Sequence, residues 1–105
     1  MSVGMEAIAL KSIAISYDGN ASRIIPFQSA ELITVTQYGD KLWYIDISGV
    51  SDEELLQWFS QSEDIGVGVI ATAEGGSVYR GEGYLHPNEP NKAAAIRGNG
   101  KLLEG

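Results

Sequence analysis

Apolar and polar residues alternate along most of this chain, and that pattern predicts β-strands. Residues 7–17 alternate with a change of face at Lys11-Ser12, which suggests a β-bulge. Segments 31–38 and 41–47 also alternate, are rich in β-branched and aromatic residues, and are joined by Gly39-Asp40. We therefore expect strands over these three segments.

Two shorter signals complete the first half of the chain. Residues 18–20, Asp-Gly-Asn, predict a hairpin turn, because Gly and Asn tolerate positive φ. Residues 23–27 contain Pro26, which cannot donate a ladder hydrogen bond, so this segment is expected at an edge. In segment 41–47, Trp43 and the two isoleucines that follow at alternate positions should face the core.

Over residues 51–63 the spacing of the apolar residues changes from that of a strand to that of a helix. Ser51 and Glu54 have the S-x-x-E spacing of a capping box, and acidic residues in the first turn favour the positive end of the helix dipole. Trp58 falls on the apolar face and is expected to pack as a core residue. The sequence therefore predicts one amphipathic helix whose role is packing.

Three more strands are expected after the helix. Segments 65–73 and 77–85 flank the turn 74–76, an irregular loop with two prolines follows at 86–91, and segment 92–103 forms the last strand. Four strands, a helix and three strands in one chain of 105 residues predict a single, mainly β domain. The expected architecture is an antiparallel β-sandwich or small barrel of about seven strands with one flanking helix.

A repeated glycine motif stands out in the last two strands. The chain reads R-G-E-G-Y-L at 80–85 and R-G-N-G-K-L at 97–102. Neither copy has the glycine spacing of a dinucleotide-binding or Walker loop, and no helix is expected after either. Gly81, Gly83, Gly98 and Gly100 are therefore interpreted as structural glycines that bend the strands or admit a close backbone.

Composition narrows the classes of function. The chain has no cysteine, so disulfides and thiol chemistry are excluded, and its net charge of −7 disfavours binding to phosphate backbones. His86, the one histidine, lies in the expected loop without a partner for a catalytic triad. We expect no enzyme activity, no cofactor, no metal, no specific nucleic-acid binding and no membrane association.

The second half of the chain resembles the tail-tube proteins of long-tailed bacteriophages and contractile-injection systems. The features in common are the helix at 51–63, the strand at 65–73, G-E-G-Y-L at 81–85 and G-N-G-K-L at 98–102. The resemblance implies a self-assembling structural protein of the virion, a tail-tube or tail and baseplate component. It further implies a homo-oligomer, with a hexameric ring as the leading count, other tail proteins as partners, and the host cytoplasm as the place of assembly.

The residues alone leave a second class of function open. A small acidic domain of this kind is also suited to be a monomeric binding module, or an inhibitor that occupies a basic partner protein. Tyr79 and Tyr84 lie in a strand that is expected to bend, and an exposed aromatic side chain there would suit a protein interface. No sequence motif assigns a role to residues 1–50.

Overall fold

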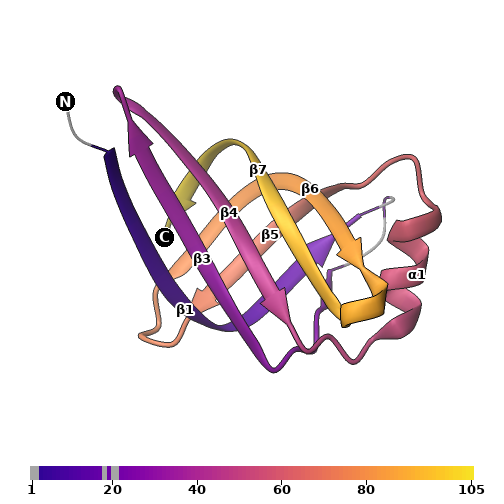
Figure 1. Cartoon of the computed structure of the whole chain (residues 1–105). Coiled ribbons are helices and arrows are strands. Elements are labelled where there is room, and N and C mark those ends of the chain that lie inside the picture. Colours follow the sequence, from indigo (N-terminus) through magenta and orange to yellow (C-terminus); the bar gives the residue numbers. More distant parts are fainter. Residues whose placement is uncertain (1–2, 18, 20–21) are drawn as a thin grey trace.

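The computed structural model describes residues 3–17, 19 and 22–105, and most of them form one antiparallel sheet (Figure 1). In order around the sheet the strands are β2 (Arg23–Ile24), β1 (Val3–Ser16), β3 (Ser29–Gln37), β4 (Asp40–Ser48), β7 (Ala93–Glu104), β6 (Val78–Asn88) and β5 (Gly66–Ala73). Because β5 also pairs with β1, six of these strands close into a barrel. The prediction of a small barrel of about seven strands is confirmed.

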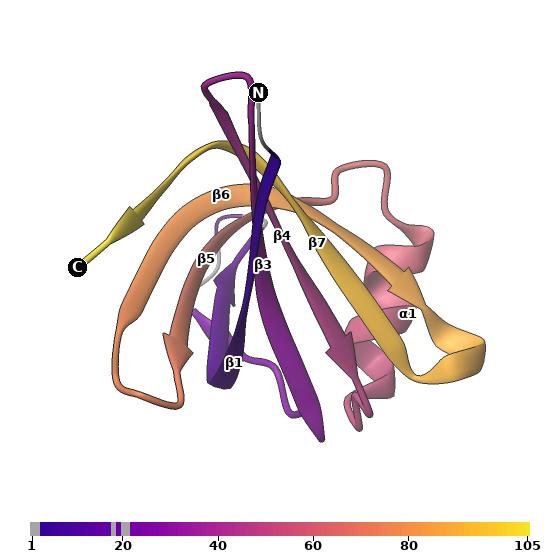
Figure 2. The same ribbon diagram turned by 60° about the vertical axis from the view of Figure 1, so that its left-hand side comes forward.

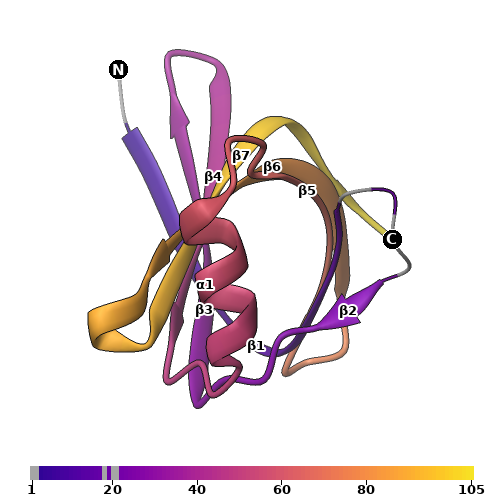
Figure 3. The same ribbon diagram turned by 90° about the vertical axis from the view of Figure 1, so that its right-hand side faces the viewer.

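One α-helix, α1 (Glu53–Gln61), connects β4 to β5 and lies beside one end of the barrel (Figure 3). Its apolar face is buried through Leu55, Leu56 and Phe59. The helix is two residues shorter at each end than the expected 51–63. Its position still fits the flanking role that the sequence predicts.

The barrel interior is filled by rows of apolar side chains from neighbouring strands. Leu32, Ile45, Ile96 and Leu85 are register partners from β3 to β6, and each is fully buried. This alignment follows from the two-residue period of the strands, which sends every second side chain inward. As expected, Trp43 shares the inward face with Ile45 and is buried.

The suspected bulge near Lys11 is present in β1. This strand pairs with β3 as far as Ala9 and with β5 from Leu10, and its register with β5 shifts between Leu10 and Ser12. β1 thus changes neighbours where its alternation changes face. The turn predicted at 18–20 lies largely outside the described residues, while Arg23–Ile24 forms the expected short edge strand beside β1.

The prediction of a loop at 86–91 is wrong for residues 86–88. β6 continues to Asn88, with Pro87 opposite Ala94, and only Glu89–Asn91 leave the sheet, as a short 3-10 helix. Beyond Leu85 the register partners of β6 lie in β7 alone, among the described residues. A proline is tolerated in a strand with one free side, so Pro87 does not end this strand.

Three strands continue past the closed wall of the barrel. β1 joins β5 from Leu10 onward, and β4 joins β7 from Tyr44 onward, whereas β1, β3 and β4 stay paired as far as Gln37. We call residues 3–8, 34–37 and 40–43 the extension. Figures 1 and 2 show it projecting from the barrel, with the β3–β4 turn at its tip.

Candidate interaction surface

The glycines of the repeated motif surround the indole of Trp43. A β-carbon at Gly98 would lie 2.4 Å from Trp43 Cε2, and one at Gly81 would lie 2.9 Å from Cζ2. The indole Nε1 donates a hydrogen bond to the carbonyl of Gly100 at 3.2 Å. Two glycines of the motif therefore leave room for a large ring, and a third accepts its N–H.

Gly83 and Gly98 are direct register partners in β6 and β7. A β-carbon at Gly83 would lie 2.5 Å from the backbone oxygen of Arg97, so the two strands approach too closely for any side chain there. Gly100 has φ of +86°, and the register between the strands shifts between Arg80 and Glu82. Both motifs thus lie in adjacent, strongly curved strands (Figure 2).

The capping box predicted at Ser51 and Glu54 is wrong. The N-cap is Asp52, whose Oδ1 accepts a hydrogen bond from the backbone N–H of Leu55 at 3.1 Å. Ser51 is exposed and lies one residue before the N-cap, and Glu54 lies in the first turn of the helix. Asp is as good an N-cap as Ser, so Asp52 is an equally suitable N-cap one residue later, and the S-x-x-E spacing drew attention away from it.

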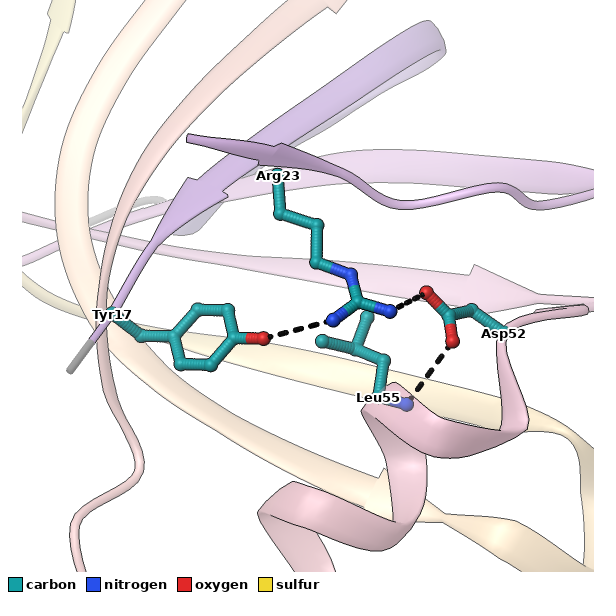
Figure 4. A network of polar contacts seen from close by, with 4 residues as sticks. All are labelled: Tyr17, Arg23, Asp52 and Leu55. Atoms are coloured by element: carbon teal, nitrogen blue, oxygen red, sulfur yellow. Dashed lines mark hydrogen bonds and ion pairs between the residues drawn. The ribbon is translucent and has the colours of Figure 1, made fainter. Parts of the chain in front are cut away.

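Asp52 has a second role that the sequence did not indicate. Its Oδ2 pairs with Arg23 Nη2, and Arg23 Nη1 donates to the hydroxyl of Tyr17 at 3.3 Å (Figure 4). The hydrogen bond to Asp52, followed by that to Tyr17, raises the pKa of Arg23. One carboxylate therefore caps α1 and ties it to β2.

The two tyrosines proposed as interface residues do not form a common surface. Tyr79 is half-buried and packs against the core. Tyr84 is 42% exposed, and its hydroxyl accepts a hydrogen bond from Asn99 Nδ2 at 3.3 Å. Of the pair, Tyr84 is the more exposed.

Within the described part of the chain, His86 and Glu53 do not belong to a cluster that could hold a metal ion. His86 is exposed in β6, and among the described residues no group of three or more His, Cys, Asp or Glu side chains is placed to hold a metal ion. Glu53 lies in the first turn of α1 and forms an exposed ion pair with Lys92, 3.6 Å between Oε1 and Nζ.

The extension carries an exposed apolar row that sequence analysis missed. Met5, Val35 and Leu42 are register partners across β1, β3 and β4. Met5 is 69% exposed and Leu42 is 61% exposed, and both lie on the outward face. The sequence did carry a signal for this row, because the strand alternation places these residues on the face opposite the core. Large apolar side chains on that face gain nothing from the barrel interior.

Both sides of the extension are open strand edges within the described part of the chain. On one side, residues 3–8 of β1 have register partners only in β3; on the other, residues 40–43 of β4 have partners only in β3. Unpaired edges of this kind readily accept another strand. The row of exposed apolar side chains connects one open edge to the other.

β4 and β7 are paired at Tyr44 and separate on the side of residues 40–43, which leaves a space between the two strands with Trp43 at its inner end. We call the space between residues 40–43 and 98–102 the fork. One hollow of about 210 Å³ is lined by Thr34, Lys41, Trp43, Lys101 and Leu102. A second, of about 340 Å³, is lined by Val35, Leu42, Trp43, Tyr44, Arg97 and Gly98. The fork is therefore an apolar space that is flanked by cationic side chains.

Comparison of the chain with models of protein families, with curated proteins and with solved structures found no match. No helix in the described part of the chain is long and apolar enough to cross a membrane. The fold and the surface chemistry of the extension therefore carry the functional argument.

Proposed function

We propose that this chain is a self-assembling structural subunit, a tail-tube or tail and baseplate component of a phage or phage-like particle. The observation that carries self-assembly is the extension, in which an exposed apolar row links two open strand edges. Apolar patches and open edges of this kind mark protein–protein contacts. The place in a phage tail rests on the resemblance of residues 51–105.

In this proposal, copies of the chain contact one another through the extension, and the barrel is the rigid support of the extension. A hexameric ring is the leading assembly, and other tail proteins are candidate partners. Assembly takes place in the host cytoplasm and ends in the virion. The proposal assigns no catalytic step, cofactor or metal ion to the chain.

The mass of the protein in solution tests self-assembly. Light scattering coupled to size exclusion, over a range of concentrations, is expected to show species larger than the monomer, and negative-stain imaging to show rings or tubes. Met5→Ser and Leu42→Ser should each reduce assembly. Ile24→Ser is the matched control, since Ile24 is 68% exposed on β2, outside the extension. A monomer at every concentration would contradict the proposal.

One observation favours the second class, an acidic binding module. Glu31 lies directly opposite Asp46 on the outside of the barrel, and like charges in register destabilise a sheet. A basic partner protein would relieve this repulsion. A strictly monomeric protein that binds a basic partner, and loses that binding in Glu31→Gln or Asp46→Asn, would support this function instead.

A further inference from the structure

We infer that copies of this chain associate head to tail, with the first residues of β1 of one copy entering the fork beside β4 of the next. The inference rests on the proposed self-assembly and specifies its contact. It names two surfaces, the edge of residues 3–8 and the edge of residues 40–43. Each copy presents both, one on either side of its extension.

Strand direction makes the two edges compatible. β1 and β4 are both antiparallel to β3, so they run parallel to each other. A neighbour that continues the sheet in the same orientation therefore sets its β1 parallel to β4. The inner and outer faces are then preserved from one copy to the next, because side chains alternate strictly across a strand.

The apolar row continues across such a contact. Met5, Val35 and Leu42 occupy one row within a copy, so Leu42 at the open edge is followed by Met5 of the neighbouring copy. Both side chains are more than half exposed in the single chain. Contact would remove the outer part of both side chains from water, which favours association.

Charge complementarity supports the same pairing on the opposite face. Glu6, Thr34 and Trp43 are register partners, so Glu6 lies on the face that bears Trp43 and Lys41. In the neighbouring copy this carboxylate enters the hollow lined by Lys41 and Lys101. None of these three charged residues forms an ion pair within the described residues. The contact gives all three a partner of opposite charge.

Pairing of identical edges is less favourable for the same reason. Two copies of the β4 edge would bring Lys41 toward Lys41, and two copies of the β1 edge would bring Glu6 toward Glu6. Like charges set opposite each other destabilise a strand pair. A contact between unlike edges repeats from copy to copy and gives closed rings or open filaments.

Cysteine cross-linking separates the arrangements, because the natural chain has no cysteine to interfere. After mild oxidation, an equimolar mixture of Met5→Cys and Leu42→Cys should give a disulfide-linked dimer, and neither variant alone should. A chain with both substitutions should give a ladder on a non-reducing gel that ends at the number of subunits in the ring. Ile24→Cys, treated alike, controls for random collision.

Charge exchange provides an independent readout. Glu6→Lys and Lys41→Glu should each weaken self-association about tenfold, by replacing attraction with repulsion at the contact. The double variant should recover part of the loss, with Lys101 opposing full recovery. Glu63→Lys, an exposed acid near the end of α1, is the control and should leave association unchanged.

The outcomes distinguish this contact from the proposed function. Oligomers that cross-link only in the mixture, or as a ladder in the double variant, support head-to-tail pairing. Oligomers in which Met5→Cys or Leu42→Cys links to itself would overturn it while leaving self-assembly intact, as would oligomers without any cross-link. A strictly monomeric protein would remove both proposals.

Discussion

Gly98 lies against the indole of Trp43, so closely that a β-carbon at residue 98 would fall 2.4 Å from Cε2 of the ring. This relationship gives the second R-G-x-G motif a steric purpose. Gly81, from the first motif, lies against the same ring, with 2.9 Å between its ideal β-carbon and Cζ2. The two motifs meet at one buried tryptophan.

Gly98→Ala should therefore destabilise the protein by about 1–3 kcal/mol, because the added methyl group forces a buried ring to move. Chemical denaturation followed by circular dichroism measures the change. Gly75→Ala is the matched control, since it lies in a turn with open space around its ideal β-carbon and should change stability little. If Trp43→Phe relieves part of the cost in the double variant, the clash with the ring is its source.

Gly83→Ala should cost about 3 kcal/mol, more than alanine at Gly98. Its methyl group would meet the backbone oxygen of Arg97 at 2.5 Å, and a backbone in a paired strand moves less readily than a side chain. Thermal unfolding of the two variants side by side tests the order. Equal stability of Gly83→Ala and the natural protein would contradict the close approach of β6 to β7.

Asp52→Ala should destabilise the protein by about 1–2 kcal/mol, by removing the cap of α1 and a partly exposed ion pair with Arg23. Asp52→Asn keeps an oxygen for the cap and should cost less. Ser51→Ala is the matched control, since Ser51 is exposed outside the helix. Urea unfolding measures the free energy of unfolding of each variant. A larger loss of stability for Ser51→Ala than for Asp52→Ala would support the capping box predicted from the sequence.

Phe59→Ala should cost more than Trp58→Ala, although tryptophan is the larger residue. Phe59 is 2% exposed within the core, whereas Trp58 is half-buried and contacts Tyr17 and Phe59 by ring packing, with centroids 4.7 Å and 4.8 Å away. We expect about 3–5 kcal/mol for Phe59→Ala and a smaller loss for Trp58→Ala. Equilibrium unfolding of both variants checks the order, and the reverse order would place Trp58 in the core.

Much of the barrel was predictable because strand alternation is local. The bulge near Lys11 and the burial of Trp43 beside Ile45 follow from a few neighbouring residues. The turn between β3 and β4 falls one residue earlier than the expected Gly39-Asp40, at Tyr38-Gly39, where both residues have positive φ and Asp40 already belongs to β4. Pro87 misled the prediction, because whether a proline ends a strand depends on which sides of that strand are paired. That information comes only from the tertiary arrangement.

The candidate surface was predictable only in part for a similar reason. Leu42 could be assigned to the face opposite Trp43, but its alignment with Met5 requires the register of three strands. The link between Arg23 and Asp52 joins residues from β2 and the start of α1, which no local pattern relates. Contacts between distant segments set both features.

The place of β7 in the wall has a consequence for folding. It is the last strand in sequence order, yet it lies between β4 and β6, so the wall has a gap until β7 has docked. Every chain that has formed only its first six strands exposes the edges of both neighbours. Such long-range closure is slow compared with hairpin formation, and open edges favour aggregation in the meantime. The two ends of the wall, at β4 and β6, therefore stay open to other chains until the strand between them has formed.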